Sequence, residues 1–182
     1  MIRDVPLNDR HPPGTLIPFS HPNSNVRMPP FEYRTSGITS IELIRPLWVQ
    51  LNEYHHTRAG TFRQHYEKMT FDDRKKFFEK IASTGSLQLD LVFDTESGRY
   101  IGYCVSSLSQ EKKGEIESIF VEDRYRSRGI GSALVTRALA WLDANGSVRN
   151  RVSVGDGNEG AWKFYLGFGF YPRMTVLEQN RE

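Results

Sequence analysis

One stretch of the chain constrains the fold more than any other, because it combines a strand, a short charged turn and a long helix. Alternating apolar residues predict a strand at 115–121, and apolar residues at helical spacing predict a helix at 129–145 that Gly146 ends. Before this stretch, two further strands are predicted at 87–93 and 100–108, separated by a hairpin turn. Strands that first pair locally and then alternate with helices predict an α/β protein of the mixed α+β type, with one central, mostly antiparallel sheet and helices on both faces.

Hydrophobic spacing also predicts the remaining elements. Leu43, Leu47 and Leu51 recur at helical spacing, and the aspartates that follow Thr70 favour the N-terminal end of a second helix. Short apolar runs predict the elements that follow the long helix. The predicted elements outside the central stretch are helices from Ile41 and after Thr70, a strand at 152–154, a helix at 159–166 and a last strand at 171–177.

The first 30 residues differ from the rest of the chain in composition. They hold seven of the nine prolines of this 182-residue chain, and they contain few large apolar groups. Such a segment lacks the pattern of a packed element. We therefore expect a flexible, Pro-rich arm at 1–30, followed by a single domain at 31–182.

Composition argues against several classes of partner. The 24 basic and 22 acidic residues give a net charge of only +2, which offers no broad basic face, so we expect no nucleic-acid partner. Nowhere is there a run of about 18 apolar residues, so we expect no membrane span. The single cysteine, Cys104, cannot form an internal disulfide and fits a reducing compartment, which favours a cytoplasmic protein. The sequence leaves a homodimer open.

The turn between the predicted strand and the long helix indicates a site for an anion. Free N–H groups at the start of a helix favour a negative ligand, and Gly129 and Gly131 would let that ligand approach the main chain. Arg126 and Arg128 oppose the helix dipole, which suggests that an anion completes the site. Spacing alone leaves an ordinary solvated turn open. A dinucleotide-binding turn lacks its first glycine here, and a Walker turn lacks its closing Gly-Lys-Ser or Gly-Lys-Thr.

The spacing of Arg126, Gly129 and Gly131 resembles the signature of the GNAT superfamily of N-acetyltransferases, in which Arg or Gln precedes Gly by three residues and a second Gly or Ala by five. Residues 158–170 resemble a second motif of that superfamily. The resemblance implies acetyl-CoA as co-substrate, no metal, and a parallel strand pair that splays apart to admit the thioester. The residues that it assigns to acetyl-CoA are Ile119, Phe120, Val121, Arg126, Ser127, Arg128, Gly129, Ile130, Gly131, Ser132, Asn158 and Tyr165.

Two side chains are candidates for proton transfer. An amine must lose a proton before it attacks, and Glu117 is the leading base, with Glu115 on the same strand face as the substitute and water as a further carrier. The resemblance places Tyr165 as the acid that protonates the departing thiolate, although helical spacing also allows it to be a core residue. Asn158 is expected to cap the short helix, to bind the cofactor, or both.

The resemblance implies transfer of an acetyl group from acetyl-CoA to a primary amine, by direct attack in a ternary complex. A small molecule is the expected acceptor, a peptide or protein amine is the nearest alternative, and a non-catalytic acyl-CoA sensor is an alternative of a different class. We expect the first two helices and their connection to recognise the acceptor, and the histidines there match no metal spacing. The candidates in this segment are Glu53, His55, His56, His65, Tyr66 and Glu67.

Overall fold

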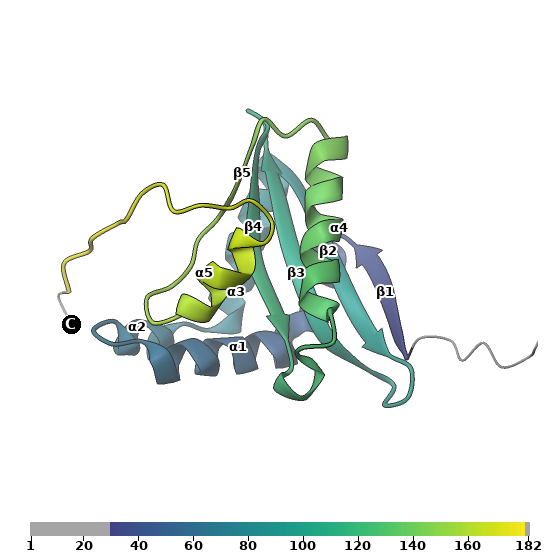
Figure 1. The fold of residues 1–182 in the computed structure, drawn as a ribbon, viewed down its shortest axis with the longest axis horizontal. Helices are drawn as coiled ribbons and strands as arrows, with labels where there is room; N and C mark the ends of the chain where they lie inside the picture. The colour runs from purple at the N-terminus through teal and green to yellow at the C-terminus, as the bar shows by residue number, and fades with distance from the viewer. Residues whose placement is uncertain (1–29, 181–182) are drawn as a thin grey trace, which may run out of the picture.

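The computed structural model describes residues 30–180, which form one mixed α/β domain around a five-stranded sheet (Figure 1). The predicted arm at 1–30 lies outside the described residues except for its last residue. The strands, which lie side by side in chain order, are β1 (Phe31–Ser36), β2 (Gly85–Asp94), β3 (Arg99–Ser109), β4 (Lys113–Val121) and β5 (Arg149–Val152). Strands β1 to β4 pair antiparallel with one another, and β5 runs parallel to β4. The predicted fold class is therefore confirmed.

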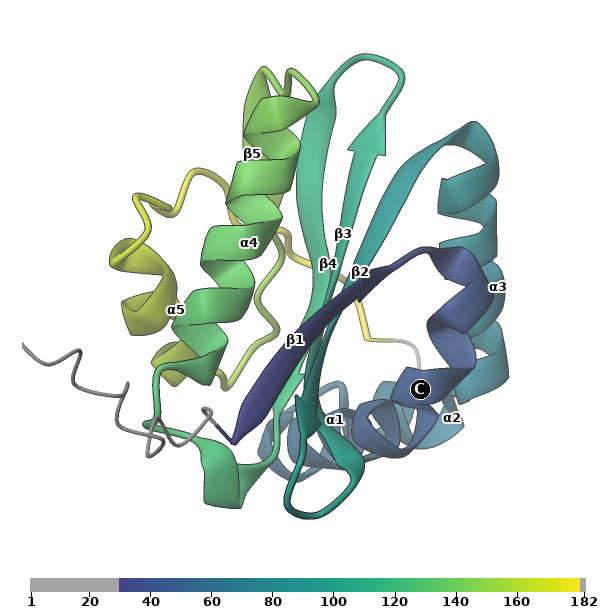
Figure 2. The same cartoon turned by 90° about the vertical axis from the view of Figure 1, so that its right-hand side faces the viewer.

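Helices cover both faces of the sheet (Figure 2). In chain order they are η1 (Ile38–Ile44), α1 (Arg45–Arg58), α2 (Arg63–Lys68), α3 (Phe71–Thr84), η2 (Asp123–Tyr125), α4 (Ile130–Ala144) and α5 (Glu159–Leu166). On one face, Ile44 and Phe78 pack against Tyr103 of β3. On the other, Leu134 of α4 and Tyr165 of α5 pack against the sheet. No helix within residues 30–180 is long and apolar enough to cross a membrane.

Strand β4 contains a bulge that changes the direction in which its side chains point. Val105 of β3 pairs with Ser118, but the next residue, Ser106, pairs with Ile116, so Glu117 is an extra residue in β4. The extra residue breaks the alternation of faces. Ser118 consequently lies on the same face as Glu117, where its hydroxyl is 2.9 Å from that of Tyr103. In a regular strand Ser118 would lie on the opposite face from Glu117. The expectation of regular alternation along β4 is therefore wrong at this point.

The parallel pair β4–β5 separates just before the bulge. Its register ends where Ile116 pairs with Val152, and in the described part of the chain no strand pairs with that edge of β4 from Glu117 to Val121. The splayed parallel pair that the resemblance implied is therefore present. The gap falls directly before the turn that leads into α4 (Figure 1).

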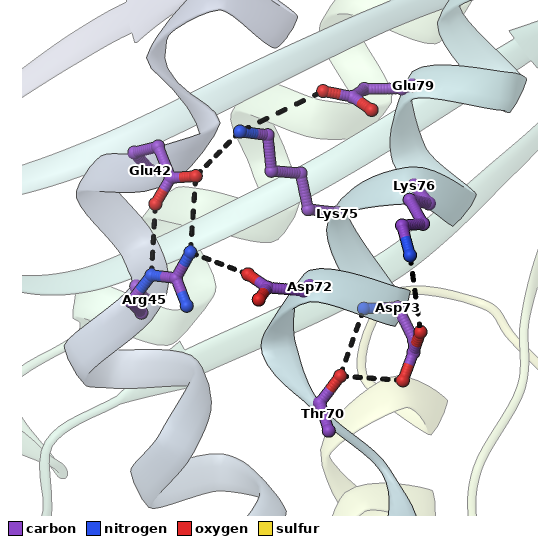
Figure 3. Close-up of polar contacts among 8 residues, drawn as sticks. All are labelled: Glu42, Arg45, Thr70, Asp72, Asp73, Lys75, Lys76 and Glu79. Atoms are coloured by element: carbon purple, nitrogen blue, oxygen red, sulfur yellow. Dashed lines mark hydrogen bonds and ion pairs between the residues drawn. The ribbon is translucent and has the colours of Figure 1, made fainter.

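Helix α3 begins and is held as its sequence predicts. Thr70 is the N-cap, and its hydroxyl accepts a hydrogen bond from the N–H of Asp73 (Figure 3). Glu42 of η1 accepts from both Arg45 and Lys75, which ties η1 to α3 and lowers the pKa of Glu42 to about 2. These contacts fix the helix over the face on which the bulge projects.

The prediction of a last strand at 171–177 is wrong. That segment has no regular structure, and its large apolar side chains are 76–92% exposed. An alternating pattern stabilises a strand only when one face is buried, and here the chain leaves α5 and runs away from the sheet, where Asn180 donates to the carbonyl of Thr61. The prediction also missed β1 and α2. The helix predicted from Ile41 is η1 followed by α1, the strand predicted at 152–154 meets β5 only at Val152, and α4 starts one residue later than predicted, since Gly129 is the N-cap.

Candidate active site

A cleft of about 950 Å³ opens where β4 and β5 separate. Its walls come from α1, α3 and β4 on one side, and from the start of α4, the end of β5 and α5 on the other. All the site residues predicted from the sequence line this cleft, except Arg128 and Ile130. The side chain of Ile130 is only 1% exposed and packs in the core, so its main-chain N–H alone can face a ligand.

The turn into α4 presents a row of unpaired N–H groups. Within residues 30–180, the main-chain N–H groups from Ser127 to Ser132 have no acceptor, and Gly129 offers no side-chain cap. Ser127 and Gly129 adopt φ values of 59° and 77°, which turn successive N–H groups toward one side. Backbone of this form at a helix N-terminus binds phosphate groups. The geometry therefore fits the pyrophosphate of coenzyme A.

The arginine side chains in the turn are mostly engaged by the protein. Arg126 donates from Nε to the carbonyl of Val121 over 3.0 Å and from Nη2 to Asp123 over 2.9 Å. It therefore closes the turn, and it occupies one carbonyl of the free edge of β4. Arg128 lies over the ring of Tyr125, with 5.6 Å from its guanidinium carbon to the ring centre. The main chain, rather than these side chains, is consequently the part of the turn whose donors are available to an anion.

Glu117 lines the cleft from the bulge, and among the described residues only one side chain donates a hydrogen bond to its carboxylate. Ser107 donates to its Oε1 over 2.6 Å. Partial burial raises the pKa of Glu117 above its ordinary value, nearby Glu115 raises it further, and the Ser107 hydrogen bond opposes the rise. A carboxylate with a raised pKa is a stronger base than a solvated one.

Glu115 also lines the cleft, as its alternation with Ile116 predicts, but it is committed to other partners. Arg151 of β5 donates to it over 2.6 Å, and Ser153 donates to its other oxygen over 3.2 Å. Both oxygens of Glu115 thus have partners within the protein, so neither is available to an amine without breaking a contact. The structure therefore favours Glu117 over Glu115 as the candidate base.

Tyr165 and Asn158 enter the cleft from the opposite side to Glu117, one within α5 and one at its start. The ring of Tyr165 is packed in the core, but its hydroxyl makes no hydrogen bond with any residue that the structure describes. Burial raises the pKa of Tyr165 well above its usual range, so the phenol stays protonated. Asn158 is the N-cap residue of α5 but makes no side-chain cap hydrogen bond. The side-chain cap that was one expected role of Asn158 is therefore absent, and its side chain makes no hydrogen bond with the part of the chain that the structure describes.

The predicted acceptor segment divides into two groups. His55 and Tyr66 line the cleft, where their rings stack with centres 5.3 Å apart. Glu53, His56, His65 and Glu67 do not line it, and Glu67 is paired with His56 over 3.0 Å. Residues 30–180 hold no group of three His, Cys, Asp or Glu side chains arranged for a metal ion.

Arg74 is the functional candidate that sequence reasoning missed. It lies on α3 within a run of charged residues, a pattern typical of a solvated helix face. Its guanidinium nevertheless lines the cleft, and its Nη2 donates to the main-chain carbonyl of Glu117 over 2.5 Å. Only the spacing from Arg74 to the buried Phe78, four residues apart on one helix face, was a signal in the sequence.

Comparisons with known proteins agree with this geometry. The sequence model of the Acetyltransferase (GNAT) family matches residues 50–170. An uncharacterised N-acetyltransferase of Methanocaldococcus jannaschii is 35% identical over 72 residues, which are 40% of this chain and 32% of that protein. The chain thus matches about a third of the length of that relative.

Solved structures share the fold at low sequence identity. Aminoglycoside N-acetyltransferase AAC(6')-Iy, in complex with a bisubstrate analogue that contains CoA, has a TM-score of 0.61 and 19% identity, over 84% of this chain and 98% of that one. Ribosomal-protein-alanine N-acetyltransferase from Brucella melitensis has a TM-score of 0.57 and 11% identity, over 82% and 99%. At these identities the likeness shows the fold alone, and the two named activities differ in acceptor.

Proposed function

The chain belongs to the GNAT acetyltransferase family, and from that membership we propose that it transfers an acetyl group from acetyl-CoA to a primary amine of a small molecule. One observation carries the proposal: the unpaired N–H groups of Ser127–Ser132 open onto the same cleft as Glu117 and Tyr165. An anion-binding turn, a base and an acid then surround a single space. This arrangement supports direct attack in a ternary complex, because the anion-binding turn and the two proton-transfer candidates line one cleft.

The residues on the donor side fit coenzyme A. The N–H groups of the turn would hold the pyrophosphate, and glycine at position 129 leaves the approach open, since no atom lies within 4 Å of where a Cβ would stand. The edge of β4 at Ile119 and Phe120, left without a strand partner by the splay, would pair with the amides of the pantetheine arm. The free amide of Asn158 supplies a further donor on the other wall.

The chemistry needs two protons removed from the ammonium nitrogen and one supplied to the departing sulfur. Glu117 accepts the first proton, directly or through a water molecule, and the neutral amine attacks the thioester carbonyl. The new C–N bond forms as the C–S bond breaks, and the nitrogen loses its second proton to solvent as the amide forms. Tyr165 donates its proton to the departing sulfur, and solvent then reprotonates the tyrosine. Its raised pKa ensures that the proton is present at the start of the reaction.

The test is an assay of free thiol released from acetyl-CoA, run with small amines, amino acids, polyamines, aminoglycosides and peptides. Aminoglycosides and N-terminal alanine peptides belong in the panel because the structural neighbours AAC(6')-Iy and the ribosomal-protein-alanine enzyme are named for such acceptors. We expect thiol release that depends on the amine, with one acetyl group added to it by mass spectrometry. Calorimetric binding of acetyl-CoA with no release across the whole panel would instead identify an acyl-CoA sensor. Release with peptides alone would identify a peptide acceptor.

A further inference from the structure

Arg74 places a positive charge in the half of the cleft that is lined by α1, α3 and β4, which we call the acceptor half. Its guanidinium lies over the rings of Phe77 and Phe78, with 4.8 Å and 4.6 Å to their centres, and donates to the carbonyl of Glu117. Among residues 30–180, no carboxylate lies within ion-pair distance of it. One N–H is used, and the remaining donors of the guanidinium have no acceptor among the residues that the structure describes.

Glu117 is the nearest candidate for a counter-ion, but it loses its negative charge when it accepts a proton in the proposed reaction. Its carboxylate is held by Ser107 and is not in contact with Arg74. Once Glu117 has taken the proton of the amine it is neutral, and the partly desolvated Arg74 loses the carboxylate charge that acts on it most, which leaves Glu115, already ion-paired with Arg151. A buried charge without a partner is costly. An anion brought by the acceptor would offset that cost at the step where it arises.

The surroundings of Arg74 are also unfavourable to a polycation. His55 lies in the same half of the cleft, and its pKa is lowered first by partial burial and then by the positive charges of Arg58 and Arg74, which would also act on a cationic ligand there. Among the described residues, the carboxylates that line the cleft are Glu117 and Glu115, and Glu115 is ion-paired with Arg151, whereas Asp156 acts on Tyr66 from outside the lining. The acidic residues of the predicted acceptor segment, Glu53 and Glu67, lie outside the cleft.

We propose that the acceptor is a small primary amine that carries an anionic group, a carboxylate or a phosphate, only a few bonds from the nitrogen, and that Arg74 binds this group. The short spacing follows from the geometry: the amine must reach the side chain of Glu117 while the anion reaches a guanidinium bound to the carbonyl of the same residue. Amino acids fit this description. This inference rests on the proposed acetyl transfer and narrows its acceptor.

The experiment compares matched amines with and without the anion in the thiol-release assay. The pairs are alanine with alaninamide and O-phosphoethanolamine with ethanolamine, and neamine serves as a polycation. A hydrogen-bonded contact to a charged group corresponds to a preference of about tenfold or more in kcat/KM for the anionic member of at least one pair. The carboxylate and phosphate pairs distinguish the two sources of charge.

Variants of α3 separate recognition from a structural role of Arg74. In Arg74→Gln the ratio of kcat/KM within the preferred pair is expected to fall to about one. The ratio in Arg74→Lys is expected to lie between that of wild type and that of Arg74→Gln. Lys76→Gln removes the same charge from an exposed site on the same helix and keeps the wild-type ratio (Figure 3). A purely structural role would lower the rates for both members of a pair equally and preserve the ratio.

Two results would overturn the inference while leaving acetyl transfer intact: ratios at or below one in the wild-type protein, or an unchanged ratio in Arg74→Gln. Neamine as the best acceptor would do the same. If no amine releases thiol, the proposed function itself fails. Ligand-observed NMR of alanine, alaninamide, O-phosphoethanolamine and ethanolamine with the CoA-saturated protein then decides the anion preference separately, since binding needs no turnover.

Discussion

Replacing Ser107 with alanine removes the hydroxyl that donates to Glu117 Oε1 over 2.6 Å. That hydrogen bond stabilises the charged carboxylate and holds the pKa of Glu117 down against the effects of burial and of Glu115. Below its pKa Glu117 is protonated and cannot accept a proton from the amine. Loss of the bond therefore raises the pKa, and the acid limb of the pH–rate profile moves to higher pH.

The size of the shift follows from the bond that is lost. A hydrogen bond to a charged group contributes about 1.5–3 kcal/mol, and one pKa unit corresponds to about 1.4 kcal/mol. The side chain of Glu117 faces the cleft, where water can partly replace the hydroxyl. We therefore expect the lower end of the range, a shift of about one pH unit.

The assay is kcat/KM for one amine, measured from the acid limb to the plateau in wild type and Ser107→Ala. The titration of the amine is the same for both proteins, so a difference between the limbs belongs to the enzyme. Ser106→Ala is the matched control, because Ser106 is the neighbouring residue on the opposite strand face and contacts Cys104 instead. Glu115→Gln is expected to move the acid limb to lower pH, because it removes a charge that raises the pKa of Glu117. Coincident limbs in wild type and Ser107→Ala would refute Glu117 as the base.

Three further predictions concern the turn, the acid and the fold. Gly129→Ala is expected to weaken acetyl-CoA binding at least tenfold by calorimetry, because a Cβ would face the pyrophosphate; Gly146→Ala, at the same positive φ on the other end of α4, strains the backbone equally and should leave binding unchanged. Tyr165→Phe should lower kcat by about 10²-fold or more with little change in acetyl-CoA affinity, and an unchanged single-turnover rate would remove Tyr165 as the acid. Thr70→Ala removes the cap of α3 and should lower the free energy of unfolding by about 1 kcal/mol in urea titrations, whereas an unaltered value would mean that the cap bond contributes nothing (Figure 3).

The parts of the site that the sequence predicts are those built from neighbouring residues. The turn of Arg126, Gly129 and Gly131 encodes its own geometry, because positive φ values and free N–H groups follow from local residue types. The cap of α3 at Thr70 is local for the same reason. Most strands and helices were likewise predictable from periodicity.

The parts that the sequence does not predict depend on pairing across the fold. The bulge at Glu117 is a property of the register between β3 and β4, and no residue type in β4 predicts it. Arg74 belongs to the cleft only because α3 packs over that bulge, 43 residues away in sequence. The error at 171–177 has the same origin: the segment has an alternating pattern, but it pairs with no strand within residues 30–180.

The bulge at Glu117 links the three requirements of the proposed reaction. It turns the carboxylate and Ser118 toward the same face, and it coincides with the end of β4–β5 pairing, which leaves the edge that coenzyme A would use. It also leaves a main-chain carbonyl that Arg74 binds, so the cation that would select the acceptor is placed by the same residue that would deprotonate it. Base, donor edge and acceptor cation are thus positioned by one irregularity. A change that restored regular pairing in β4 would consequently disturb all three together, whereas substitutions at Ser107 or Arg74 disturb one at a time.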